Sequence, residues 1–274
     1  MDRTSLQSCT RETVRLAMAV AAALVTAQSA SAQIVVASDL IVERVAVPGE
    51  TYKAAITIRN TTDTAQVAVL SLSDYRFDAA GSNWFDPPGS NARSNAGWIA
   101  LSQQAVSLPP RGTQAVSYTV AVPAGTAPPV GTYWSVVLIE ADQRPAAAAD
   151  PSTLVIVPRT RYAVQLATHV AGEARECRLA FGEPQVTSGE LAIDITSAEI
   201  RACRPKLRLE VYDADGALRH TTTQRGAFLY PDTSARHRFD LPALAPGDYS
   251  FLLVADVGAD ALQGARFQVQ ILQP

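Results

Sequence analysis

The sequence predicts an all-β protein made of two β-sandwich domains in tandem. Helical periodicity is almost absent, whereas short stretches of alternating apolar and polar residues recur between turns rich in Gly, Pro, Asn and Asp. About seven such strands with regular turns are typical of one sandwich. The 274-residue chain, less an N-terminal leader, is about twice the usual size of a domain, so it has room for two.

Residues 1–32 have the pattern of a cleaved signal peptide. Arg3, Arg11 and Arg15 give a positive start, residues 16–25 form an apolar run too short to span a bilayer, and Ala30-Ser31-Ala32 offers a small-residue cleavage site. We therefore expect a soluble, exported protein that begins at Gln33.

The charge of the mature chain argues against nucleic acid as a partner. Removing the leader, which carries a net charge of +1, changes the formal charge from −3 to −4, and no basic cluster is evident. No later apolar run approaches the roughly 20 residues of a membrane helix, so we expect no membrane insertion.

Residues 33–170 are predicted to form the first domain. Pro48-Gly49 and Asn60-Thr61-Thr62-Asp63 are turns, and residues 78–97 are predicted to be a loop because they are rich in Gly, Ser, Asn, Asp and Pro. The predicted strands cover residues 34–47 (with a break near Ser38-Asp39), 52–58, 67–72, 98–101, 116–122, 132–140 and 153–166.

The last predicted strand of this domain is unusual. After an Ala/Pro-rich loop, the apolar run 153–157 passes through Pro158 directly into Arg159 and Arg161. Such a strand can pair with another chain through its backbone while a cation at its end binds an anion. A core strand that happens to end in arginines is the alternative.

Residues 171–274 are predicted to form the second domain, after a hinge at Ala171-Gly172. Tyr249, at the start of the next-to-last strand, is typical of the tyrosine corner of immunoglobulin-like sandwiches. Asp213-Ala214-Asp215-Gly216 resembles the start of a calcium loop but lacks the other ligands, and it is better explained as a β-turn. The predicted strands include residues 191–195, 207–211, 249–253 and 267–271.

Two of the three cysteines, Cys177 and Cys203, remain after removal of the leader with Cys9. In an oxidising compartment a bridge between them is expected to stabilise the fold by roughly 3 kcal/mol. A thiol nucleophile or a metal site is the alternative, although neither cysteine lies in a C-x-x-C pair and the sequence holds three histidines.

Catalytic signatures are missing from the sequence. It contains no G-x-S-x-G, no H-E-x-x-H, no phosphate-binding loop and no dinucleotide fingerprint. The sequence therefore predicts no enzyme, no cofactor and no metal.

Several stretches of the first domain match a known family in order and spacing. They are Arg44-Val45-Ala46-Val47-Pro48-Gly49-Glu50, Ile58-Arg59-Asn60, Leu108-Pro109-Pro110-Arg111-Gly112, residues 131–138 and residues 154–161. Together they resemble the periplasmic chaperones of the chaperone–usher pilus pathway (PapD-like proteins), from the first strand to the F–G loop and G strand. The second domain matches that family poorly, beyond its size and its all-β pattern.

This resemblance implies two immunoglobulin-like domains set in an L, in a periplasmic chaperone that stabilises pilus or surface-fibre subunits by donor-strand complementation. The donor strand would hold Leu154, Ile156 and Pro158, although Pro158 removes one ladder hydrogen bond. Two basic residues of the interdomain cleft would bind the subunit's C-terminal carboxylate: Arg44, and Arg161 or, one β period earlier, Arg159. An outer-membrane usher is a further partner that the pathway implies.

A second interpretation keeps the export and the fold but changes the partner. The second domain resembles the C-terminal domain of surface proteins that bind WxL-type proteins on Gram-positive walls, although those proteins carry a C-terminal membrane helix that this sequence lacks. In this interpretation the protein is an exported adhesion or scaffold module that binds a surface protein or a wall polymer.

Overall fold

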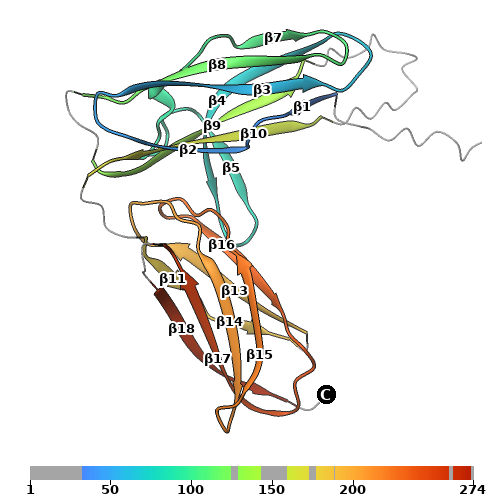
Figure 1. Ribbon diagram of the computed structural model, residues 1–274, viewed down its shortest axis with the longest axis vertical. Coiled ribbons are helices and arrows are strands. Elements are labelled where there is room, and N and C mark those ends of the chain that lie inside the picture. The colour runs from blue at the N-terminus through green and yellow to red at the C-terminus, as the bar shows by residue number, and fades with distance from the viewer. Residues whose placement is uncertain are drawn as a thin grey trace, which may run out of the picture.

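The computed structural model describes residues 33–124, 129–142, 159–172, 177–187, 189–258 and 262–272. These residues form the strands of four sheets, together with one short 3-10 helix, and the predicted all-β fold of two immunoglobulin-like sandwiches is confirmed (Figure 1). In the described ranges no helix is long and apolar enough to cross a membrane. The predicted leader, 1–32, and the predicted donor run, 153–158, lie outside the described residues.

The N-terminal sandwich, which holds the strands up to residue 170, consists of two sheets. One has the order β1-β3-β8-β6, and the other has the order β2-β10-β9-β4-β5, with β7 also on β4. Its elements are β1 (Ile34–Val36), β2 (Ile41–Ala46), β3 (Thr51–Asn60), β4 (Gln66–Phe77), β5 (Asn83–Asp86), η1 (Ala96–Trp98), β6 (Ile99–Leu101), β7 (Ala105–Leu108), β8 (Thr113–Ala121), β9 (Gly131–Ala141) and β10 (Arg161–Val170).

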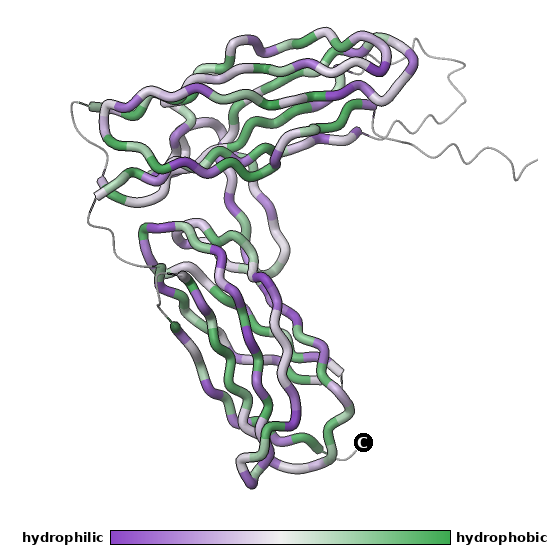
Figure 2. Tube along the Cα trace, in the orientation of Figure 1, coloured by the Kyte–Doolittle hydropathy of each residue, from purple (hydrophilic) through white to green (hydrophobic). Residues whose placement is uncertain are grey.

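The core of this sandwich lies between the two sheets. Ile56 and Ile58 on β3 and Val116 on β8 face Val137 and Ile139 on β9, and all five are almost fully buried. Along β3 and β8, more exposed residues alternate with these buried ones, and Figure 2 shows hydrophobic and hydrophilic residues alternating along strands of the sandwich. β9 differs because nine consecutive residues from Gly131 are buried. A strand covered on both faces needs a continuous apolar run, which explains the composition of residues 132–140.

The structure corrects the prediction that residues 78–97 form a loop. β4 continues to Phe77, beyond the predicted end at residue 72, and turns back into β5, so a long hairpin extends from the N-terminal sandwich toward the second one (Figure 1). At its tip the amide of Ala79 donates to Ser234 Oγ at 3.0 Å, and Phe77 packs against the core of the second sandwich. Four residues between Gly/Ser turns carry too little periodicity to predict β5.

The family-like stretches around Asn60 and Pro109 meet in the structure. Asn60 is fully buried, and its Nδ2 donates to the carbonyls of Thr64 and Pro109 at 2.8 and 2.9 Å. Beside them, Arg111 pairs with Asp63 at 2.7 Å. These residues therefore join two turns of the sandwich, which is a structural role.

The C-terminal sandwich also consists of two sheets. In one, β13 pairs with β11, β12 and β16, and the other has the order β15-β14-β17-β18. The strands run in a clearly different direction from those of the N-terminal sandwich (Figure 1). Its elements are β11 (Leu179–Phe181), β12 (Gln185–Val186), β13 (Glu190–Ser197), β14 (Lys206–Asp213), β15 (Leu218–Arg225), β16 (Ser234–Asp240), β17 (Gly247–Asp256) and β18 (Leu262–Ile271).

Both sandwiches contain a tyrosine corner. Tyr249 donates its hydroxyl proton to the carbonyl of Ala245 at 3.0 Å, as its position in the sequence suggests. Tyr133 on β9 makes the same contact to the carbonyl of Pro129, also at 3.0 Å. The second corner escaped the sequence analysis because Tyr133 lies inside a continuous apolar run.

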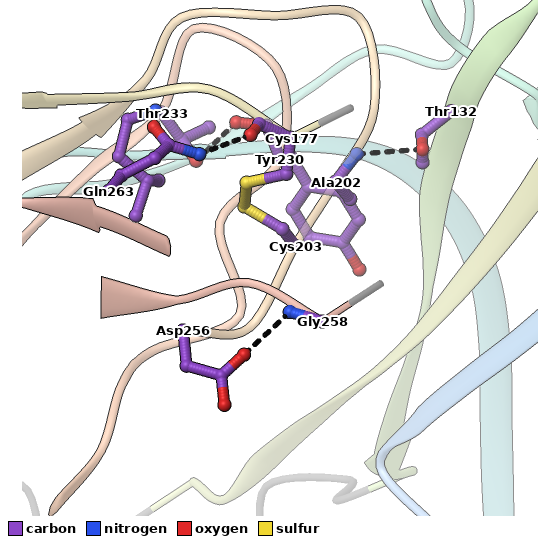
Figure 3. Close-up of a disulfide and its surroundings, with 10 residues drawn as sticks. Thr132, Cys177, Ala202, Cys203, Tyr230, Thr233, Asp256, Gly258 and Gln263 are labelled. Carbon is purple, nitrogen blue, oxygen red and sulfur yellow. Dashed lines mark hydrogen bonds between the residues drawn. A yellow bond between two sulfur atoms is a disulfide. The ribbon is translucent and has the colours of Figure 1, made fainter. Parts of the chain in front are cut away.

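The predicted disulfide between Cys177 and Cys203 is present, with a Cα–Cα distance of 5.9 Å (Figure 3). Cys177 precedes β11 in one sheet, and Cys203 precedes β14 in the other. The bridge therefore joins the two sheets of the C-terminal sandwich at one end.

Candidate functional site

The two sandwiches pack against each other through a small, specific junction. Tyr230, fully buried, stacks on Trp134 with ring centroids 4.6 Å apart, and its hydroxyl donates to Gln165 Oε1 at 2.8 Å. The amide of Ala202 donates to Thr132 Oγ1 at 2.8 Å (Figure 3). Because both faces are packed and hydrogen-bonded, the junction positions the two sandwiches and defines the cleft beside it.

A cleft of about 380 Å³ lies at this junction. Glu43 and Val45 on β2 and His169 on β10 line it from the N-terminal side. The C-terminal side contributes mainly the loop before β14, the end of β15 and the aromatic ring of Phe228. Its lining residues are Cys177, Arg201, Ala202, Cys203, Arg204, Arg225, Phe228 and Val257.

Three arginines make the C-terminal wall of the cleft basic. The guanidinium of Arg204 lies 5.0 Å from the centre of the Phe228 ring, and Arg201 Nε is buried without a hydrogen-bond acceptor. Within the described ranges, Arg201, Arg204 and Arg225 form no ion pair. A guanidinium presents a fork of donors that matches a carboxylate, so this wall can bind an anion.

The N-terminal wall holds one acidic and one titratable group. Glu43 Oε2 lies 3.4 Å from His169 Nε2, and His169 Nδ1 lies 2.9 Å from Thr132 Oγ1. Burial lowers the pKa of His169 below its ordinary value, and the charge of Arg201 acts in the same direction, whereas Glu43 opposes both. His169 is therefore neutral near pH 7, and Glu43 is the acidic group of a cleft that holds three arginines.

Arg44 does not face this cleft. Glu43 and Val45 line it, and because side chains alternate along a strand, Arg44 between them points to the opposite face of β2. There its guanidinium lies 4.6 Å from the centre of the Tyr52 ring and 3.3 Å from Glu50 Oε1. Arg44 is half exposed and already paired.

Arg161 lies at the other end of the same strand pair, and it too is paired, with Glu140 at 3.1 Å. Thr168 is the residue of β10 that aligns with Arg44 on β2. Arg161 precedes Thr168 by seven residues, which separates it from Arg44 by about 23 Å along the strand. The prediction that Arg44 and Arg161 approach each other at one carboxylate is therefore wrong, and Arg159 lies further away in the chain.

The sequence analysis missed the arginines that do line the cleft. Their signal was a local density of basic residues around one cysteine, in Arg201-Ala202-Cys203-Arg204-Pro205-Lys206. The loop before β14 is not a strand, so its side chains do not alternate between two faces. The spacing of the arginines in this run therefore does not predict which of them share a face.

Comparison with known proteins gives a likeness of fold. No family model and no curated protein matches the sequence. Solved structures similar to it include the class 5 fimbriae chaperone CfaA, at 12% identity over 87% of this chain and 100% of that chain, with a TM-score of 0.44. The Pseudomonas aeruginosa CupB2 chaperone follows, at 12% identity over 86% and 100%, with a TM-score of 0.39.

A chain of the Salmonella enterica complex between the SafA pilin and the SafB chaperone is also similar, at 12% identity over 89% of this chain and 98% of that chain, with a TM-score of 0.41. The resemblance to pilus chaperones is confirmed as a likeness of fold.

Proposed function

We propose that this protein is a periplasmic chaperone that binds and stabilises secreted pilus or surface-fibre subunits. In this proposal residues 1–32 direct export, and the mature domains are 33–170 and 171–274. A subunit pairs with the strand that leads into β10, and its C-terminal carboxylate enters the cleft between the sandwiches. The carboxylate is held there by Arg201, Arg204 and Arg225 in place of the pair predicted from the sequence.

The observation that carries this proposal is the basic cleft. Arg44 and Arg161 each have a carboxylate partner, so a subunit's carboxylate would have to displace Glu50 or Glu140 to bind them. In the described part of the chain, Arg201, Arg204 and Arg225 form no ion pair, although Glu43 lines the opposite wall of the same cleft. A charge-assisted hydrogen bond to a free guanidinium is among the stronger polar contacts that a protein can offer.

The edge of β10 supports the part of the proposal in which a subunit pairs with this chain through the backbone. β2 aligns with β10 only from Gln165 onward, so among the described strands residues 161–164 pair with β9 alone. Their other edge is open to a further strand. The predicted donor residues Leu154, Ile156 and Pro158 come immediately before this open edge in the chain.

Co-expression tests the proposal directly. A candidate pilus or surface-fibre subunit is produced in the periplasm together with the wild type or with one variant. The variants are Arg201→Ala, Arg204→Ala, Arg225→Ala and Ile156→Asp. We expect the soluble subunit to co-purify with the wild type and to be lost with the cleft variants. Ile156→Asp should also abolish capture while leaving the thermal melt unchanged, because a donor side chain is not part of the chaperone's own core.

Arg44→Ala and Arg161→Ala are the matched controls. Each removes an arginine of the same chemistry that lies outside the cleft, so each should retain capture. Loss of capture in these two variants but not in the cleft variants would overturn the assignment of the carboxylate site. A large drop in the melting temperature of Ile156→Asp would instead place that residue in the core, as the scaffold interpretation requires, because it would bury an unpaired charge.

A further inference from the structure

Among the described residues, His169 alone connects the acidic side of the cleft with the hydrogen bonds that join the two sandwiches. Its Nδ1 contacts Thr132 Oγ1 at 2.9 Å, and the same oxygen accepts the amide proton of Ala202 from the C-terminal sandwich at 2.8 Å. The amide of Thr132 donates to the carbonyl of Ile200 at 2.8 Å. Thr132 therefore bridges the two sandwiches, and its hydroxyl group depends on His169.

These hydrogen bonds favour one tautomer of the neutral imidazole. Thr132 Oγ1 accepts from Ala202, and its own proton can point at His169 Nδ1, which accepts when the ring is neutral with its proton on Nε2. The neutral ring carries its proton on Nε2, facing Glu43. With a proton on Nδ1, Thr132 Oγ1 would accept from both His169 and Ala202, and the hydroxyl proton of the fully buried Thr132 would lose His169 as its acceptor.

The charges around His169 come from both sandwiches. Glu43 on β2 stands on the same sandwich, beside Nε2. Arg201, Arg204 and Arg225 of the C-terminal sandwich line the cleft that His169 shares. A positive imidazolium would be attracted by Glu43 within its own sandwich and repelled by the arginines across the junction. The added charge therefore destabilises the closed junction, although Glu43 stabilises the charged imidazolium itself.

We propose that His169 is a pH-sensitive latch of the domain junction, whose protonation removes the acceptor of the buried Thr132 hydroxyl, adds a positive charge opposite the arginines, and so loosens the C-terminal sandwich from the N-terminal one. The pKa of His169 is lowered by burial in the closed junction, whereas an exposed histidine titrates near about 6.5. The open form thus binds the proton more readily. The closed junction is favoured above about pH 6.5 and loses stability as the pH falls below that value.

Amide hydrogen exchange at Ala202 and Thr132 measures this latch, since both amides donate across the junction. After correction for intrinsic exchange rates, protection in the wild type should fall between pH 7.5 and pH 5, by at most about tenfold per pH unit, the limit set by one proton. His169→Asn keeps an acceptor near the position of Nδ1 but does not titrate, so its protection should stay flat. His237→Asn is the control.

His237 suits this purpose because burial lowers its pKa as well, but it lies on β16 inside the C-terminal sandwich. The variant should therefore keep the wild-type pH profile at the junction. Equal pH dependence in the wild type and in His169→Asn, or no pH dependence at Ala202 and Thr132 in the wild type, would overturn the latch.

Two further variants keep the wild-type histidine, and they decide the question even where His169→Asn fails to fold. Glu43 acts on His169 in both the open and the closed junction, so Glu43→Gln should shift the loss of protection to lower pH. Arg201 acts across the junction only when it is closed, so Arg201→Gln should make the total loss of protection smaller. Profiles unchanged in both variants would show that a group other than His169 titrates.

Discussion

The two sandwiches differ in how their two sheets are connected at one edge. In the N-terminal sandwich one stretch of chain supplies strands to both sheets: β1 pairs with β3, and β2 then crosses to pair in parallel with β10. In the C-terminal sandwich β11 and β12 both stay with β13. Among the described strands, β18 pairs with β17 alone.

The C-terminal sandwich replaces that crossing strand with covalent and side-chain links. The disulfide between Cys177 and Cys203 joins the sheets at the end near the junction. On the edge of β18, Gln263 accepts from the amide of Leu179 at 2.8 Å and donates to the carbonyl of Cys177. At the other end an apolar groove of about 450 Å³ remains between residues 241–244 and the end of β18. The N-terminal sandwich thus joins its two sheets with a strand that changes sheets, whereas the C-terminal sandwich joins them with a disulfide.

The largest expected effect comes from separating the two sandwiches at Tyr230. Tyr230→Ala removes a fully buried ring that stacks on Trp134, and it should cost about 3–5 kcal/mol, as other large core truncations do. We expect calorimetry to show the melting transitions of one or both sandwiches at lower temperature than in the wild type. Tyr230→Phe keeps the stack and loses only the bond to Gln165, so it should cost about 1 kcal/mol. A single unshifted transition in Tyr230→Ala would mean that the junction contributes little to either sandwich.

The disulfide should have a smaller effect, confined to one sandwich. Replacing Cys177 and Cys203 together by alanine opens a loop with a sequence separation of 26 residues and should destabilise the C-terminal sandwich by about 3 kcal/mol. The N-terminal sandwich closes its edge by strand pairing, so its amides should keep their exchange protection. Equal loss of protection in both sandwiches would show that they unfold as one unit.

The tyrosine corners should give the smallest effect and the most direct comparison. Tyr133→Phe and Tyr249→Phe each remove one hydrogen bond to a backbone carbonyl, at 3.0 Å in both cases, so each should cost about 1 kcal/mol in denaturant unfolding. Similar losses are expected because the geometry is the same. A much larger loss for Tyr249→Phe would indicate that the sandwich with the open edge depends more strongly on its corner.

The sequence by itself determined what is local in this protein. The period-2 alternation of residues 52–58 and 116–122 predicted β3 and β8, because a strand with one buried face needs that pattern whatever its partner is. Tyr249 predicted its corner from its place at the start of a strand. Cys177 and Cys203 predicted their bridge because they are the two cysteines that follow the predicted leader.

Tertiary structure alone decided which charges meet. Whether Arg44 faces the cleft depends on which face of β2 is turned toward the C-terminal sandwich, and its distance from Arg161 depends on the register of β2 with β10. Register is a relation between strands more than 100 residues apart in the chain, and a shift of one residue reverses every side chain. The residues around each arginine in the sequence do not indicate the register or the face that is turned to the other sandwich. The cleft of Arg201, Arg204 and Arg225 therefore forms only when the two sandwiches are packed together.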